Sequence, residues 1–441
     1  MPSKNHTPKD FAKKVYDELL RLKLRPPKLE ILINLFETMY FASLQSEESQ
    51  RIAFDLIYAD PRNPDPNPPP YIRNSRWKYF PLSKPFPMTI SSLAKVAKAS
   101  DNRTSSFVVH PDTRGRMYVW GLIDQGHLFY ALTNLDATGY FPRPGIFQAS
   151  IAGIGHLVAY KGMSKIAELK RDCLMRPALK VLLGGPIHDL LIRGIEPNLQ
   201  AVRSQLSKYS PNNPVSWIEA IKQVWIFSLC RLLLRVQNYR KGGAILITPD
   251  ARTKGLNIKY RLRHKRLPAA LTKHVLLQIR EYYKLHLPES SYLEKPVKEI
   301  PIKHLRERII IQAEMDDSKS EVDGTLWFIS LLTRVDGLVL LSPSFEVKGL
   351  GVEITYAKEP ANVFIALDRD AKKLRSVDYN HYGTRHRSMM RYCAQTPGSI
   401  GFVISQDGDV RVMTKARGRL IMWENISLKF PDMLGRLTKE S

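Results

Sequence analysis

Residues 335–341 read VDGLVLL and residues 382–388 read YGTRHRS, and these stretches decide the fold expected for the C-terminal half of the chain. In the first, an Asp-Gly turn abuts a run of buried-strand residues. In the second, glycine and threonine open a helical pattern that carries two arginines and a histidine. Working outward, residues 243–247 (GAILI) predict a buried strand, and residues 400–405 predict a strand ending in a hairpin turn at 406–409. We therefore expect a C-terminal mixed β-sheet flanked by helices.

A strongly marked helix precedes these strands. Ser216 and Glu219 have the spacing of a capping box, and apolar residues then recur at helical spacing for several turns. Beyond the first strand, residues 256–262 predict a second strand, residues 271–283 a helix and residues 326–332 another strand. The capped helix marks the start of the C-terminal domain.

The N-terminal half carries a shorter, mixed pattern. Helical spacing begins after Pro8 and ends at Pro26. Residues 107–109 and 117–120 are β-like runs on either side of a Pro-Asp-Thr-Arg-Gly turn, which predicts a hairpin. A turn-rich stretch at residues 209–214 ends this region. We expect a compact α+β module here.

The fold class expected for the whole chain is α+β, with an α/β-like C-terminal sheet. At 441 residues the chain exceeds the size that one hydrophobic core usually supports. The predicted boundaries are residues 1–210 for the N-terminal module, 215–425 for the C-terminal domain and 426–441 for a C-terminal tail.

The chain is strongly basic. Its 67 Lys and Arg residues outnumber 42 Asp and Glu residues, which gives a formal charge of +25 and a pI near 9.8. Such a surface attracts nucleic acid, anionic membranes and nucleoside triphosphates, and net charge alone does not separate them. A basic surface that only aids solubility is the alternative. No helix-turn-helix, zinc-finger or RNA-recognition signature supports a nucleic-acid partner.

Cysteine usage and hydropathy indicate the compartment. The three cysteines, Cys173, Cys230 and Cys393, form no C-x-x-C pair, so neither a zinc site nor a disulfide framework is expected. Residues 1–14 are polar and charged, unlike a signal peptide. The longest apolar run, residues 224–236, is too short and too interrupted by polar residues to span a bilayer. We expect a cytoplasmic protein without a transmembrane segment.

Two motifs carry groups suited to phosphate chemistry. Backbone amides beside a glycine, the hydroxyl of Thr384 and the guanidinium groups of Arg385 and Arg387 are what phosphate oxygens require. A basic turn on a basic protein is nevertheless often only solvated. The Asp-Gly pair at 336–337 is, by itself, more often a turn than a metal site. Taken singly, each motif leaves both interpretations open.

Taken in order, the motifs closely resemble the diadenylate cyclase domain over residues 216–422. The shared features are the Gly-Ala-apolar strand, the Asp-Gly pair before a strand, the complete Gly-Thr-Arg-His-Arg sequence that opens a helix, and an apolar strand ending in Ser-x-Asp-Gly. In that family, an Asp-Gly-Ala motif and a Gly-Thr-Arg-His-Arg motif build one active site.

The resemblance implies a reaction that needs two copies of the domain. Two domains face each other, each holds one ATP, and each ribose 3′-hydroxyl attacks the α-phosphorus of the other ATP, which releases pyrophosphate and closes cyclic di-AMP. A homo-oligomer follows from this arrangement. Asp336 is the implied ligand of Mg²⁺ or Mn²⁺ and helps to activate the 3′-hydroxyl. Gly337 and Leu338 are implied to let the backbone approach the nucleotide.

The resemblance assigns the phosphates mainly to the second motif. The implied nucleotide-binding residues there are Gly383, Thr384, Arg385 and Arg387. The implied catalytic residues are Asp336, Arg385, His386 and Arg387. Ser405 and Asp407 lie where the family has a Ser-Glu-Glu turn, which makes Ser405 a nucleotide-binding residue and Asp407 a second metal ligand.

Four positions depart from the family pattern. Leu338 replaces the alanine after Asp-Gly, which implies a more crowded nucleotide pocket. Val335 replaces a common histidine, and the Ser-Glu-Glu turn has become Ser405-Gln406-Asp407. The phosphate-binding motif is therefore complete, while the metal site has fewer ligands.

Residues 114–124 (RGRMYVWGLID) resemble the sensor-type (DACNV-like) regions that precede some diadenylate cyclase domains in bacterial nucleotide-signalling and defence systems. The expected function is therefore a diadenylate cyclase regulated by an N-terminal sensor. One alternative is a catalytically degenerate nucleotide-binding sensor, in which the arginines survive without a working metal site. The other is a basic nucleic-acid-binding protein.

Overall fold

The chain forms two compact units, one within residues 1–177 and one spanning residues 178–428. The division falls before the predicted boundary at 210, because helix α5 (Pro186–Tyr209) packs against helix α6 (Pro214–Asn238) in the second unit. The computed structural model describes residues 5–47, 50–64, 77–100, 104–124, 145–162, 164–209, 214–239, 241–249, 253–286, 302–406 and 408–428.

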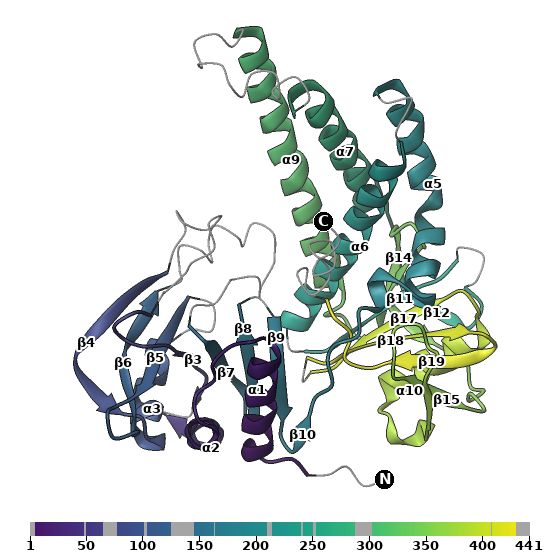
Figure 1. Ribbon diagram of the computed structural model, residues 1–441. Coiled ribbons are helices and arrows are strands. Elements are labelled where there is room, and N and C mark those ends of the chain that lie inside the picture. Colours follow the sequence, from purple (N-terminus) through teal and green to yellow (C-terminus); the bar gives the residue numbers. More distant parts are fainter. Residues whose placement is uncertain are drawn as a thin grey trace. The chain divides into compact units, whose positions relative to one another are not determined.

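The first unit is an eight-stranded sheet with helices on one face (Figure 1). The strand order is β10-β9-β8-β7-β3-β5-β6-β4, and only the β3–β5 pair is parallel. The elements are α1 (Pro8–Arg21), α2 (Leu29–Ser43), β1 (Ser46–Glu47), β2 (Gln50–Arg51), β3 (Asp55–Tyr58), β4 (Lys78–Pro87), α3 (Ile90–Val96), the 3₁₀ turn η2 (Ala97–Ala99), β5 (Ser105–Pro111), β6 (Met117–Asp124), β7 (Phe147–Gly153), β8 (His156–Lys161), β9 (Ser164–Lys170) and β10 (Cys173–Leu174).

Local sequence explains how this unit is built. Thr7 and Asp10 form a capping box at the start of α1, and Pro8 occupies the first helical turn. Alternating residues of the strands pack under the helices, as Leu56 does, or face the other side of the sheet, as Ile57 does. The β5–β6 hairpin confirms the predicted one.

The second unit is a nine-stranded mixed sheet in the order β12-β14-β13-β11-β17-β18-β19-β15-β16. The β11–β13 and β15–β19 pairs are parallel. Besides α5 and α6, its elements are η3 (Val181–Leu183), β11 (Gly243–Ile247), β12 (Leu256–His264), α7 (Arg266–Glu281), the π-helical turn η4 (Tyr282–His286), α9 (Ile302–Leu332), β13 (Leu338–Leu341), β14 (Val347–Ile354), β15 (Val363–Ala366), β16 (Leu374–Val377), η6 (Tyr379–His381), α10 (Thr384–Gln395), β17 (Ile400–Ile404), β18 (Val410–Ala416) and β19 (Arg419–Trp423).

Helices cover both faces of this sheet (Figure 1). Ala244 and Leu246 of β11 lie in a core with Met389 and Met390 of α10. Because successive strand residues alternate between the two faces of a sheet, Gly243 faces the opposite side. There it lies against Val236 of α6. The sheet is therefore held between α10 on one face and the α6 side on the other, which confirms an α+β fold with a mixed sheet and flanking helices.

Two details differ from the sequence analysis. Residues 326–332, predicted as a strand, form the last turns of α9, where Val322, Leu326 and Ile329 are buried at helical spacing. A short apolar run cannot by itself distinguish a strand from a buried helix. Helix α6 begins at Pro214, so Ser216 lies inside it and not at its cap. In the part of the chain that the structure describes, no helix is long and apolar enough to cross a membrane.

Candidate functional site

The two sequence motifs come together at one edge of the second sheet. Strands β11 and β13 are parallel and both begin there, while β17 runs antiparallel to β11 and ends there. Gly242 precedes β11, Asp336 precedes β13 by two residues, and Ser405 follows β17. We call this place, defined by Gly242, Asp336 and Ser405, the motif edge.

Arg385 reaches the motif edge from α10. Its Nη1 atom lies so close to Gly242 that a Cβ added to this glycine would be only 2.6 Å away. The same added Cβ would be 3.1 Å from the carbonyl oxygen of Ile404 and 3.6 Å from the amide nitrogen of Gln406. Gly242 also has a φ of +72°, which favours glycine. The guanidinium of Arg385 therefore converges with the ends of β11 and β17, although the three segments are far apart in sequence.

The N-terminus of α10 adds a second source of positive potential beside Arg385. Gly383 is the N-cap and provides no side chain to satisfy the first amides of the helix. The amides of His386 and Arg387 bond to the Gly383 carbonyl at 3.0 and 3.1 Å, whereas the amides of Thr384 and Arg385 precede this ladder. Thr384 and Arg385 are exposed. Such a helix end favours an anion.

His386 is neutral in this environment. Its Nε2 accepts a hydrogen bond from Nη1 of Arg411 at 3.0 Å, and Nε of Arg411 lies 3.2 Å from the Glu424 carboxylate. Burial, followed by the charges of Arg411 and Arg385, lowers the pKa of His386 to about 4. His386 therefore contributes no positive charge near neutral pH. Its Nε2 accepts the hydrogen bond that holds Arg411 in place.

Arg387 is not brought to the same place as Arg385. Residues two positions apart on a helix point about 200° apart, because each residue turns the helix by about 100°. The carbonyl of Arg387 accepts a bond from the Tyr379 hydroxyl at 3.4 Å, and Arg387 shares its side of α10 with Arg391. The Nε atoms of both are buried without a hydrogen-bond partner. The two side chains leave α10 in different directions, and the prediction that both contact one triphosphate stays a prediction.

Both members of the Asp-Gly pair are exposed, and Gly337 also lies close to the backbone of a neighbouring strand. Asp336 is exposed in the turn before β13, and it helps, after Glu353, to raise the pKa of Lys259 on the neighbouring strand β12. Gly337 has a φ of +107°, and an added Cβ would lie 2.7 Å from the carbonyl carbon of Gly351 on β14. Close strand packing therefore accounts for this glycine. The Leu338 side chain is 5% exposed and belongs to the core under α10, not to an open pocket.

Ser405 stabilises the hairpin between β17 and β18. Its Oγ accepts a bond from the amide of Asp409 at 3.0 Å, and its own amide donates to the Asp409 carbonyl at 2.9 Å. Asp407, the second predicted metal ligand, lies outside the described residues. Within those residues, no group of three or more His, Cys, Asp or Glu side chains is placed to hold a metal ion. Asp336 alone fits a Mg²⁺ or Mn²⁺ ion that takes its other ligands from water and phosphate, as Mg²⁺ often does.

Two further cations at the motif edge were not singled out from the sequence. Lys241 lies next to Gly242, and Arg334 lies two residues before Asp336; both are exposed. The only available sequence signal was their proximity to the Gly-Gly and Asp-Gly pairs, which says nothing about side-chain direction. The added positive charge of these two residues makes the motif edge more favourable for binding an anion.

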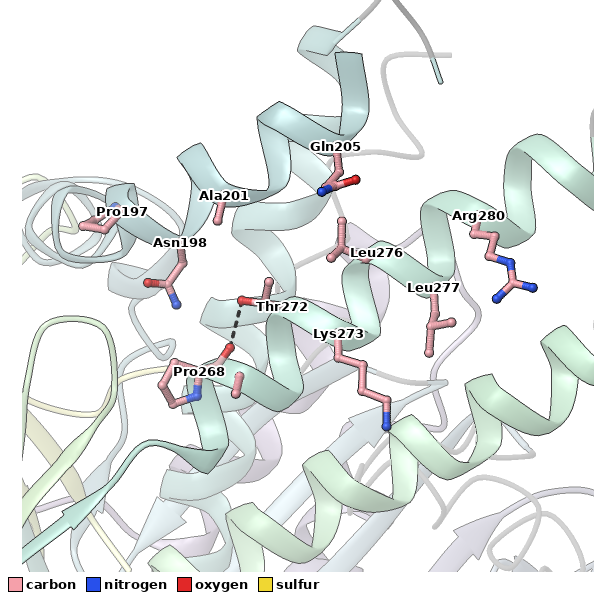
Figure 2. Close-up of a pocket in the computed structure, with 11 residues that line it drawn as sticks. Pro197, Asn198, Ala201, Gln205, Pro268, Thr272, Lys273, Leu276, Leu277 and Arg280 are labelled. Carbon is pink, nitrogen blue, oxygen red and sulfur yellow. Dashed lines mark hydrogen bonds between the residues drawn. The ribbon is translucent and has the colours of Figure 1, made fainter. Parts of the chain in front are cut away.

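A groove elsewhere in this unit contains none of the predicted site residues. It lies between α5 and α7 and has a volume of about 720 Å³ (Figure 2). Pro197 and Ala201 line it from α5, and Leu276 and Leu277 from α7. Its cations are not free to bind a ligand, since Lys273 is paired with acidic side chains of α9.

The comparison with known families concerns the first unit. Residues 23–124 match the family described as "Probable sensor domain DACNV". The matched range includes residues 114–124, on which the sensor resemblance was based, and it covers the chain from the end of α1 to the end of β6. No curated protein matches the chain. The N-terminal unit therefore contains a region similar to a probable sensor domain.

Proposed function

We propose that the protein is a diadenylate cyclase, controlled by its N-terminal sensor region, that makes cyclic di-AMP from two ATP with release of pyrophosphate. The observation that supports this most is the convergence of Asp336, Arg385 and Ser405 at the motif edge. These residues come from motifs separated in sequence, and an acidic group beside an anion-binding helix end is what phosphoryl transfer requires.

In this proposal the chain's own residues mainly position and neutralise the triphosphate. Arg385 and the free amides at the start of α10 bind phosphate oxygens. Asp336 holds Mg²⁺ or Mn²⁺, which would screen the charge that spreads over the phosphates during transfer. His386 remains neutral and accepts a hydrogen bond from Arg411. The proposal requires no phosphate contact from Arg387.

The reaction needs a second copy of the domain. Each 3′-hydroxyl must attack the α-phosphorus of an ATP on the other copy, with the attacking and leaving oxygens roughly in line. A homo-oligomer with facing motif edges follows from this requirement. The sensor region then favours or opposes that pairing, in a bacterial nucleotide-signalling or defence role.

The decisive experiment is direct. Purified protein is incubated with ATP and Mn²⁺, and cyclic di-AMP is sought by mass spectrometry, with Asp336→Asn as the matched inactive variant. We expect product from the wild type only, and an initial rate that rises more than linearly with protein concentration. Wild-type protein that binds ATP and makes no cyclic di-AMP would reject the cyclase.

A non-catalytic nucleotide sensor is the second candidate. It is favoured by the absence, among the described residues, of three or more side chains grouped to hold a metal ion, and by the engagement of the Ser405 hydroxyl in its own hairpin. Calorimetry separates the two: a sensor binds nucleotide tightly without metal and without turnover, whereas the cyclase needs the divalent ion for its reaction.

A further inference from the structure

Arg334 lies at the motif edge on the α9 side of the sheet. Its amide bonds to the Leu331 carbonyl at 3.1 Å as the chain leaves α9. The preceding residue, Thr333, lies against Gly243, where an added Cβ would be 3.4 Å from the Thr333 Cβ. Gly243 follows the glycine that Arg385 covers. Arg334 therefore directly follows a residue that packs on Gly243 from the α9 side, while Arg385 of α10 covers the neighbouring Gly242.

The Arg334 guanidinium has a fixed support. It lies over the ring of Tyr239, with its central carbon 5.6 Å from the ring centroid. The Tyr239 hydroxyl is 2.8 Å from Oγ of Ser330, a fully buried residue of α9. A cation held on an aromatic ring keeps its N–H donors, so this contact orients Arg334 without satisfying it.

Three cations around Gly242 form no ion pair with a described carboxylate. Neither Arg334, Arg385 nor Lys241 has a carboxylate within ion-pair distance among the residues that the structure describes. A cation at the end of α9 would be explained by the helix dipole alone. That explanation does not account for two further cations around the same glycine, one of them from α10.

We propose that Arg334 is a phosphate-binding residue, which with Arg385 holds the phosphate chain of a nucleoside triphosphate from the two sides of the motif edge. The inference rests on the proposed function in that a nucleotide occupies this edge. It adds a second phosphate-binding arginine outside the recognised motifs, a role that the family resemblance had implied for Arg387.

The test compares Arg334→Gln with Arg417→Gln. Arg417 is also exposed and lies in the β18–β19 turn at the opposite end of the sheet, so its variant removes the same charge from the same unit. Binding of ATP and of inorganic tripolyphosphate is measured by calorimetry without metal. We expect Arg334→Gln to weaken both about tenfold, as the loss of one charge-assisted contact would. Tyr239→Leu should weaken them less, and Arg417→Gln less than about twofold.

The outcomes separate this inference from the cyclase proposal. ATP binding that is equally affected by the Arg334 and Arg417 variants overturns the role of Arg334. Binding that depends on Arg334, in a protein that makes no cyclic di-AMP, supports the role and overturns the cyclase. Absence of ATP and tripolyphosphate binding by the wild type overturns both. Thermal unfolding of each variant verifies that the fold is retained.

Discussion

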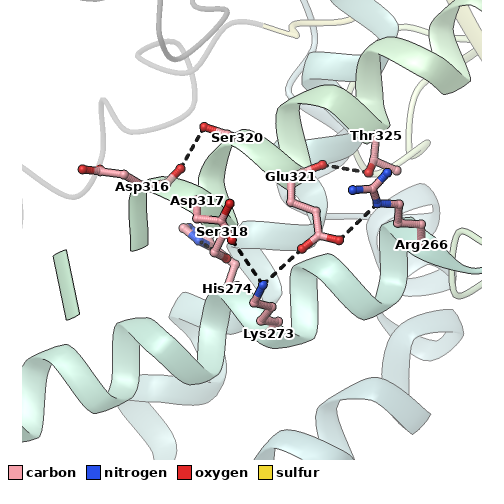
Figure 3. A network of polar contacts seen from close by, with 9 residues as sticks. All are labelled: Arg266, Lys273, His274, Asp316, Asp317, Ser318, Ser320, Glu321 and Thr325. Atoms are coloured by element: carbon pink, nitrogen blue, oxygen red, sulfur yellow. Dashed lines mark hydrogen bonds and ion pairs between the residues drawn. The ribbon is translucent and has the colours of Figure 1, made fainter. Parts of the chain in front are cut away.

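Cations on helix α7 and cations at the motif edge belong to the same unit but meet opposite surroundings. On α7, Arg266 lies 3.1 Å from Glu321 of α9, Lys273 lies 3.3 Å from the same carboxylate, and Arg280 lies 2.7 Å from Glu314 (Figure 3 draws the Glu321 group). At the motif edge, Arg385 has no described carboxylate within ion-pair distance. Outside the motif that contains Arg385, the sequence marks these residues only as basic. The structure therefore shows that the α7 cations form ion pairs with α9, whereas Arg385 at the motif edge forms none with a described carboxylate.

The largest expected effect is the loss of Arg385. Arg385→Gln should lower cyclic di-AMP formation about 100-fold or more, because a fixed positive group near the transferring phosphate is removed. Arg280→Gln, which removes an already paired cation, should change the rate less than about twofold. The measurement is the initial rate at saturating ATP. Equal losses in both variants would remove the distinction between the two regions.

A second effect concerns stability, and it compares two glycines. Gly337→Ala should destabilise the protein by about 2–4 kcal/mol, because the φ of +107° is unfavourable for alanine and its Cβ would meet the Gly351 backbone. Gly324→Ala, inside α9 with nothing within 4 Å, should instead stabilise by about 0.5–1 kcal/mol. Chemical denaturation measures both. The same sign of change in the two variants would contradict the packing described for the motif edge.

A third effect comes from His386. Because its pKa falls from 6.5 to about 4 in the folded protein, the unfolded chain binds the proton more readily. The stability that neutral His386 contributes is complete above pH 6.5 and is lost as pH falls towards 4. For this partly exposed ring we expect a loss of about 1 kcal/mol between pH 7.5 and pH 5.

The His386→Gln variant isolates this contribution, since glutamine can still accept the bond from Arg411. Its unfolding free energy should depend less on pH than that of the wild type over the same range. Identical pH profiles for the two proteins would mean that His386 takes up its proton equally in the folded and unfolded chains.

Much of the second sheet could be predicted, because its strands are short apolar runs next to glycine turns. Residues 335–341 and 400–405 were recognised in this way, and the start of α10 was placed at its glycine. Residues 326–332 were mistaken for a strand because the run was considered without the long helix before it. The local sequence pattern therefore identified an element correctly only where a turn residue bounded that element.

The site was harder to predict because it depends on the directions in which side chains point. The motif order suggested that Asp336 and Arg385 meet, and the sheet brings them to one edge. Arg387 was grouped with Arg385 although helical spacing alone separates their side chains. The stacking of Arg334 on Tyr239 joins the ends of two helices, and no local pattern encodes such a contact.

The smallest effect is expected on the paired side of the comparison. Glu321→Gln leaves Arg266 and Lys273 without this carboxylate, but Arg266 and Lys273 are well exposed, so water replaces most of the interaction. We expect a loss below about 1 kcal/mol that shrinks further at high salt. Chemical denaturation at low and high ionic strength measures it. A loss of several kcal/mol that is insensitive to salt would mean that the α7–α9 pairs are essential to the fold, and that the motif edge is not the only place in this unit where charge is important.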